Sequence, residues 1–266
     1  MPENSPLPDY LGIIRRIYPN ALSTNASVDR LLDLLQGRLG LTPSQVMSAD
    51  SICSDDLNSI EYPQRAYEML GPFKMGGLNG FPFTGLTGMG AFAHHVPADG
   101  AVFVFYAPHI GIGRDGSTAQ ILRPGQSVRS ACCGAAKAAA GKLERGEIVS
   151  GEVTELDYQQ NTIEQIFLAK RERILGAPDR LVEATEVMYE AIEARIDTLE
   201  SRTTYPCAHV ILMGAILINA DHDAGVVRRA TAFALPQREE RGQLGLDRRV
   251  RRLSRRVLFS AFTELD

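Results

Sequence analysis

The sequence lacks several features that would assign it to a special class of protein. Its 266 residues include four cysteines, too few for a disulfide scaffold, and Cys132 and Cys133 are neighbours that do not pair readily with each other. No apolar run is long enough to cross a membrane, and the first residues do not have the basic-then-apolar layout of a signal peptide. We therefore expect a cytoplasmic protein with no membrane partner.

The charge of the chain gives no general reason to expect a nucleic-acid partner. The formal net charge is −4, and a nucleic-acid-binding protein is usually basic. Residues 237–266 depart from this average because they are rich in arginine. Within them, 238–256 carries apolar residues at helical spacing, which predicts an amphipathic helix. Its apolar stripe favours docking on the body of the protein or on a partner subunit over binding of nucleic acid or membrane.

The pattern of apolar segments predicts a single α/β domain over residues 1–266, in which 1–48 form a helical N-terminal extension. The segment 101–107 is almost continuously apolar, as in a strand that is covered on both faces of a parallel sheet. Helical spacing or composition predicts helices around it, and two further apolar segments predict strands. We expect a mostly parallel central sheet flanked by helices. The helices are predicted at 9–18, 28–40, 59–70, 130–143, 157–175 and 179–201, and the further strands at 210–220 and 231–235.

Metal-binding side chains are concentrated between Cys53 and Cys133. In a reducing compartment such thiols are ligands, nucleophiles or buried apolar groups. Catalytic zinc usually has three protein ligands and one open position, and Cys53, His109 and one of Cys132 and Cys133 would supply such a set. His109 directly follows the predicted strand 101–107, where open α/β sheets bind their ligands. A redox role for the two adjacent cysteines is an alternative, and it predicts reactive thiols.

Two other groups of residues suggest sites that we consider weaker. The glycine-rich segment 76–90 has no Gly-Lys-Ser/Thr ending for phosphate, so we expect an irregular loop that walls an apolar pocket with Phe81, Phe83, Leu86, Met89 and Phe92. Near the C-terminus, a cysteine, two histidines and two aspartates could form a second metal site, but Asp-His-Asp after a strand is more often a turn. These residues are Cys207, His209, Asp221, His222 and Asp223.

The central stretch also resembles a known family. It reads Phe-Thr-Gly-Leu-Thr-Gly-Met-Gly-Ala-Phe-Ala-His-His-Val-Pro from Phe83, then Ala-Pro-His-Ile-Gly-Ile from Ala107 and Cys-Cys-Gly from Cys132. These phrases closely resemble the limiting-CO2-inducible B and C proteins, sometimes called theta carbonic anhydrases. The resemblance is dense over roughly residues 50 to 135. It implies a fold like that of the beta-class carbonic anhydrases and zinc held by two cysteines and one histidine.

The resemblance implies a role for particular residues of this chain. Cys53, His109 and Cys133 match the zinc ligands, with Cys133 preferred to Cys132, and Asp55 resembles the aspartate that lies beside the zinc. The beta class places an arginine two residues after that aspartate. Leu57 stands there in this sequence. Asp55 could bind zinc as a fourth ligand or stand back and accept a hydrogen bond from the bound hydroxide, and we predict that Arg65 is the cation that holds it away from the metal.

The function implied by the resemblance is that of a zinc-dependent carbonic anhydrase, in which zinc-bound hydroxide attacks CO2 reversibly to give bicarbonate. A homodimer in which the second subunit helps to close the pocket is also implied. His94 or His95 could carry protons to solvent because histidine titrates near neutrality. Structural hydrogen bonding is the alternative role for each, and His95 is our candidate for proton transfer. The alternative is a catalytically silent protein of the same family that binds zinc or bicarbonate in inorganic-carbon handling.

Overall fold

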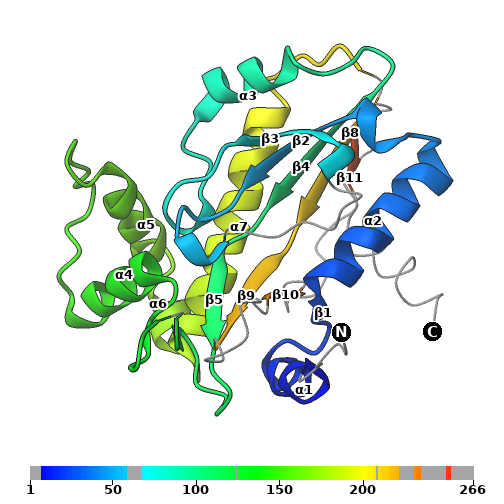
Figure 1. Ribbon diagram of the computed structural model, residues 1–266. Coiled ribbons are helices and arrows are strands. Elements are labelled where there is room, and N and C mark those ends of the chain that lie inside the picture. Colours follow the sequence, from blue (N-terminus) through cyan, green and yellow to red (C-terminus); the bar gives the residue numbers. More distant parts are fainter. Residues whose placement is uncertain are drawn as a thin grey trace.

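A computed structural model of the chain describes residues 7–58, 67–123, 125–207, 209–221, 231–234 and 250–252. A largely parallel sheet lies at its centre, and helices cover both faces (Figure 1). This arrangement confirms the predicted α/β fold class.

The central sheet contains five strands that are all parallel, in the order β11-β8-β4-β2-β3. Parallel strands must be joined by crossover connections, and helices of the chain supply several of them. Strand β4 lies in the middle and confirms the strand predicted at 101–107. The bounds are β2 (Val46–Ser51), β3 (Leu70–Lys74), β4 (Ala101–Tyr106), β8 (His209–Gly214) and β11 (Val250–Arg252).

A second sheet extends the first beyond the carboxyl ends of β4 and β8. Its order is β1-β10-β9-β5, with β5 parallel to β9 and the other pairs antiparallel. The bounds are β1 (Leu22–Ser23), β5 (His109–Ile112), β9 (Ile216–Ala220) and β10 (Thr231–Ala234), and a separate antiparallel pair is formed by β6 (Gln120–Ile121) and β7 (Ser130–Ala131).

The strand predicted at 210–220 is therefore two strands, β8 and β9, separated by Ala215. The neighbouring chain is interrupted at the same level, where Pro108 separates β4 from β5, since proline has no N–H to donate to a ladder. Hydrogen bonds still cross the interruption, from the Ala215 N–H to the Tyr106 carbonyl (3.1 Å) and from the Leu217 N–H to the Pro108 carbonyl (2.9 Å). His109 consequently begins a strand directly after the interruption between the two sheets.

Successive side chains of a strand point to opposite faces of the sheet, so the core is divided between two helical layers. Val102 and Val104 of β4 pack in the same cluster as the helices α4 to α7, whereas Phe103 and Phe105 pack with α2 on the opposite face. Figure 1 shows α2 and α7 on opposite sides of the sheet. The helices are α1 (Leu7–Ile17), α2 (Thr24–Leu39), α3 (Gly85–Ala93), α4 (Gly134–Arg145), α5 (Tyr158–Leu168), α6 (Arg171–Leu175) and α7 (Arg180–Glu200), and the short 3-10 helices are η1 (Pro43–Gln45), η2 (Asp56–Asn58) and η4 (Leu78–Gly80).

Several predicted elements differ from the structure. The helix predicted at 130–143 begins only at Gly134, after the strand at Ser130–Ala131, and the helix predicted at 157–175 is divided into α5 and α6. The helix predicted at 238–256 is wrong at Val250–Arg252, which form β11 beside β8, and the remainder of 237–266 lies outside the described residues. The helix predicted at 59–70 ends in Leu70, which begins strand β3, while 59–66 are not described. The glycine-rich segment is irregular only in its first half, because 85–93 form α3.

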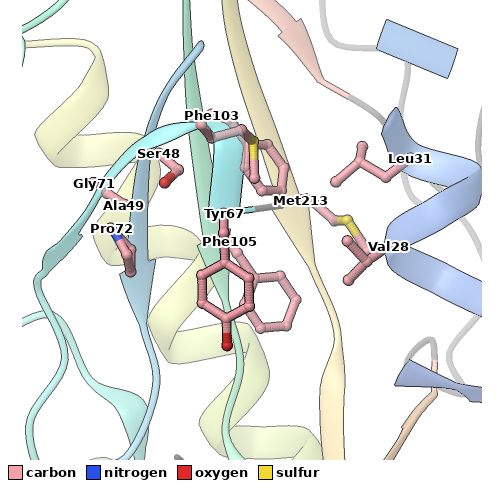
Figure 2. A pocket seen from close by; sticks show the side chains of 11 residues that line it. Val28, Leu31, Ser48, Ala49, Tyr67, Gly71, Pro72, Phe103, Phe105 and Met213 are labelled. Atoms are coloured by element: carbon pink, nitrogen blue, oxygen red, sulfur yellow. The ribbon is translucent and has the colours of Figure 1, made fainter. Parts of the chain in front are cut away.

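An apolar pocket lies between α2 and the sheet, on the face opposite α7 (Figure 2). Val28 and Leu31 reach it from α2, and Phe103, Phe105 and Met213 from β4 and β8. None of its lining residues is a predicted metal ligand. Among the described residues, no helix has the length and apolar character needed for a membrane crossing.

Candidate metal centre

Cys53, His109 and Cys133 come together at the carboxyl-terminal ends of β2 and β4. Cys53 lies two residues after β2, His109 begins β5, and Cys133 is the N-cap of α4. Their ligand atoms all lie within 4.8 Å of one another, and the three side chains are buried. Parallel strands end at a common edge of the sheet, and for this reason residues 80 positions apart in sequence can share one site.

His109 presents one ring nitrogen to this cluster without a partner from the described chain. Its Nδ1 lies 2.7 Å from the Asn219 Oδ1, whereas its Nε2 is buried and makes no hydrogen bond within the described residues. The Asn219 Nδ2 donates to the Leu57 carbonyl at 3.3 Å, which turns the amide oxygen toward the ring. Nδ1 therefore carries the hydrogen and the lone pair of Nε2 is free for a metal ion.

The two cysteine sulfur atoms lie so close together that a cation would be needed beside them for both to be ionised. The Cys53 Sγ lies 4.0 Å from the Cys133 Sγ and accepts a hydrogen bond of 3.1 Å from the Asn79 N–H. The hydrogen bond with Cys133 and burial together raise the pKa of the Cys53 thiol above its ordinary value. Two thiolates and an imidazole form a donor set typical of zinc, so the residues present fit that ion.

The structure separates the two adjacent cysteines. Cys133 contributes to the cluster, whereas the Cys132 Sγ donates to the Asn219 Oδ1 at 3.4 Å and lies 3.6 Å from the His109 Nδ1. Cys132 also packs in a small apolar group with Leu57 and Ile121. It therefore lies against the side of the imidazole that faces away from the free Nε2.

Asp55 is held by an arginine that sequence reasoning missed. The Arg123 Nη1 and Nη2 donate to the two carboxylate oxygens at 2.8 and 2.9 Å, and Arg123 is itself held by Ser130 Oγ (3.0 Å) and the Ala131 carbonyl (3.1 Å). The clamp predicted for Arg65 is thus made by Arg123, while Arg65 lies outside the described residues. No spacing rule in the sequence connects position 123 with position 55.

The clamp keeps Asp55 ionised. Burial raises the pKa of Asp55, but hydrogen bonds from Arg123 and the Leu57 N–H outweigh it, and the pKa lies well below its ordinary value. Asp55 is not a member of the three-residue cluster. The carboxylate is therefore a charged acceptor that its arginine holds beside the centre.

The structure places His95 away from the centre. His94 is the C-cap of α3, and Gly100 packs against the Gln45 carbonyl just before β2 begins, so this connection lies at the amino-terminal ends of the strands. His109 lies past the carboxyl end of β4, and six residues of strand span about 20 Å. Figure 1 shows α3 and β5 at opposite ends of the sheet. We therefore withdraw His95 as a proton carrier.

The apolar residues expected to wall one pocket are dispersed. Met89 and Phe92 lie in the main core, Phe81 and Phe83 pack against each other with ring centroids 5.0 Å apart, and Leu86 is 45% exposed. Phe81 and Phe83 precede α3, and the exposed Leu86 lies in its first turn.

The second metal site is not assembled among the described residues, in which the cluster at Cys53 is the one group with suitable geometry. Asp221 instead accepts hydrogen bonds from the Arg114 and Leu122 N–H groups (2.9 and 2.8 Å) and from Arg129 (2.7 Å). His222 and Asp223 lie outside the described residues.

Asn219 should be needed for tight metal binding because it orients the ring of His109. Replacing it by leucine, of similar size, removes the acceptor for Nδ1, and we expect zinc affinity to fall roughly 10- to 100-fold. Asn219→Asp keeps an acceptor and should stay near the wild type. Competition with a chromophoric chelator measures both, and equal affinities for Asn219→Leu and the wild type would contradict this role.

The fold and the cluster together define a class of protein. A parallel α/β sheet with this candidate metal centre at its carboxyl edge is carbonic-anhydrase-like. More particularly, the chain belongs to the family described as limiting CO2-inducible proteins B/C beta carbonic anhydrases, whose model matches residues 22–240.

Solved structures agree with this membership. The chain is 26% identical to PtLCIB4, a homolog of the limiting CO2-inducible protein LCIB, over 84% of this chain and 92% of that one, with a TM-score of 0.71. A variant of PtLCIB4 with one histidine replaced by alanine gives 26% identity, 85% and 91% coverage and a TM-score of 0.73. LCIB itself shows the same fold at 19% identity, 82% and 89% coverage and a TM-score of 0.57. No curated protein matches the chain.

Proposed function

We propose that the protein is a zinc-dependent carbonic anhydrase that interconverts CO2 and bicarbonate. The observation that carries the proposal is the buried Nε2 of His109, which has no partner within the described chain and lies within 4.8 Å of the ligand atoms of Cys53 and Cys133. A buried polar atom of this kind normally has a partner. Membership of a family described as carbonic anhydrases supports zinc as that partner.

The proposed ligands are Cys53, His109 and Cys133. Zinc bound there would leave a fourth position for water and lower the pKa of that water, by less than a three-histidine site does because two thiolates cancel the charge of the ion. Asp55 is ionised and accepts hydrogen bonds only, so it would orient a hydrogen of the reacting water. Arg123 keeps the Asp55 oxygens away from the ligand position.

Stopped-flow CO2 hydration on protein of known zinc content tests this function. We expect a zinc-dependent rate that rises between about pH 7 and pH 9, because the thiolate ligands place the ionisation of the water above neutrality. Zinc removal by a chelator should abolish the rate and zinc addition should restore it. A zinc-dependent rate that is flat from about pH 6 to 9 would contradict the expected ionisation.

A catalytically silent protein that binds zinc or bicarbonate is the second candidate. It is favoured by one departure from the beta class, the presence of Leu57 where that class has its arginine, and by the resulting use of a distant residue, Arg123, as the clamp. Full zinc occupancy with no hydration activity at any pH would support this candidate.

The homodimer and the cytoplasmic location stay predictions.

A further inference from the structure

Unpaired buried polar atoms gather around Cys53. Among the described residues, seven buried side-chain nitrogen or oxygen atoms have no hydrogen-bond partner, and four of them belong to Asn58, Asn79 and His109. Each of these residues adjoins Cys53: Asn58 donates to its carbonyl at 3.5 Å, the Asn79 N–H donates to its sulfur at 3.1 Å, and His109 shares its cluster. A metal ion would provide a partner for the Nε2 of His109, but not for the unpaired amide atoms of Asn58 and Asn79.

Of the three residues, Asn79 has the most unpaired polar atoms. Its side chain is buried, with 1% of the residue exposed, and neither the Nδ2 donor nor the Oδ1 acceptor has a partner in the described chain. Burial of a carboxamide with both groups unpaired is costly. Something outside the described residues must therefore meet this amide in the working protein.

The backbone places the amide of Asn79 beside the metal centre. Bond lengths limit its side-chain atoms to within about 8 Å of the Cys53 Sγ, since its own backbone nitrogen lies 3.1 Å from that sulfur. Asn79 has a left-handed conformation (φ 53°), which asparagine tolerates better than most residues. The next residue, Gly80, lies so close to the Ala107 carbonyl that a Cβ atom there would be 2.2 Å from the oxygen. The segment 78–80 therefore packs against the strand ends that carry the cluster.

We infer that the Asn79 carboxamide binds the oxygen atoms of a small oxyanion, bicarbonate, next to the metal centre. The inference rests on the proposed function and adds a substrate contact to it. Bicarbonate has oxygens that accept hydrogen bonds and one hydroxyl that donates. The ionised carboxylate of Asp55, which Arg123 holds in place, can only accept hydrogen bonds. An amide supplies both a donor and an acceptor, so Asn79 provides the donor that Asp55 lacks.

Bicarbonate titration of the cobalt(II)-loaded protein, followed by visible absorption, tests the inference without requiring catalysis. Asn79→Gly keeps the left-handed backbone and deletes the amide, and we expect its apparent Kd for bicarbonate to rise about tenfold. Asn79→Asp keeps the size but adds negative charge, so its Kd should rise further. Cobalt content should equal that of the wild type in both variants, because neither replaces a ligand.

Three results would overturn the inference. A Kd within about twofold of the wild type in Asn79→Gly would mean that the amide meets a buried water only. Loss of metal from both variants would make Asn79 part of the frame of the centre instead. Failure of the cobalt-loaded wild type to bind bicarbonate would remove the ligand while leaving the metal site intact. Conversely, Asn79-dependent binding in a protein with no hydration activity would support the inference and reject the enzyme.

Discussion

Cys53→Ser should reduce bound zinc from about one ion per chain to roughly a tenth of that value. Serine has nearly the size of cysteine, but its hydroxyl is not ionised at neutral pH and is a poor zinc ligand. Only His109 and Cys133 would then hold the ion, and two ligands do not complete a protein zinc site. Elemental analysis after gel filtration in the presence of a weak chelator measures the occupancy.

Two matched serine substitutions serve as controls for the loss of a buried thiol. Cys207 is buried and donates to the His209 carbonyl at 3.3 Å, outside the cluster, so Cys207→Ser should retain zinc. Cys132→Ser should also retain most of it, since the Cys132 Sγ faces Asn219 and the Nδ1 side of His109. Unchanged zinc in Cys53→Ser, or complete loss in Cys132→Ser with retention in Cys133→Ser, would contradict the ligand assignment.

Arg123→Ala should lower kcat/KM for CO2 hydration about 100-fold while zinc content stays the same. The substitution removes both hydrogen bonds to Asp55, whose side chain is only 14% exposed. The pKa of Asp55 then rises, because burial is opposed by the Leu57 N–H hydrogen bond and no longer by the guanidinium, and the carboxylate is free to turn toward the metal. Stopped-flow assays on protein of measured zinc content give the rate.

Graded replacements distinguish a specific clamp from general loss of charge. Arg123→Lys keeps the charge but cannot make two parallel hydrogen bonds, so it should fall between alanine and the wild type. Arg145→Ala removes an exposed pair with Glu147 and should leave the rate unchanged. Asp55→Asn combined with Arg123→Ala should be little worse than either single variant, because the two residues act as a unit. Rates for Arg123→Ala within about twofold of the wild type would show that Asp55 needs no clamp.

The sequence by itself determined two of the central strands, β4 and β8, and most helices, and it indicated the three candidate ligands. The segment 101–107 is almost wholly apolar, which a strand buried on both faces requires, and it forms β4. Thiols and imidazole are recognisable as ligands from their chemistry wherever the chain places them. The position of His109 directly after an apolar strand was enough to put it at the sheet edge.

Only the tertiary structure decided which residues support those ligands. Arg123 contacts Asp55 across 68 residues, and Asn219 contacts His109 across 110. Hydrogen bonds of this kind depend on how loops and strands meet in space, and they leave no period or spacing in the sequence. The same reason explains the strand at Val250–Arg252, where pairing with β8 prevails over an arginine-rich pattern that favours a helix. The local sequence pattern indicates which residues are buried and which side chains can bind a metal, whereas contacts between residues distant in sequence depend on the fold.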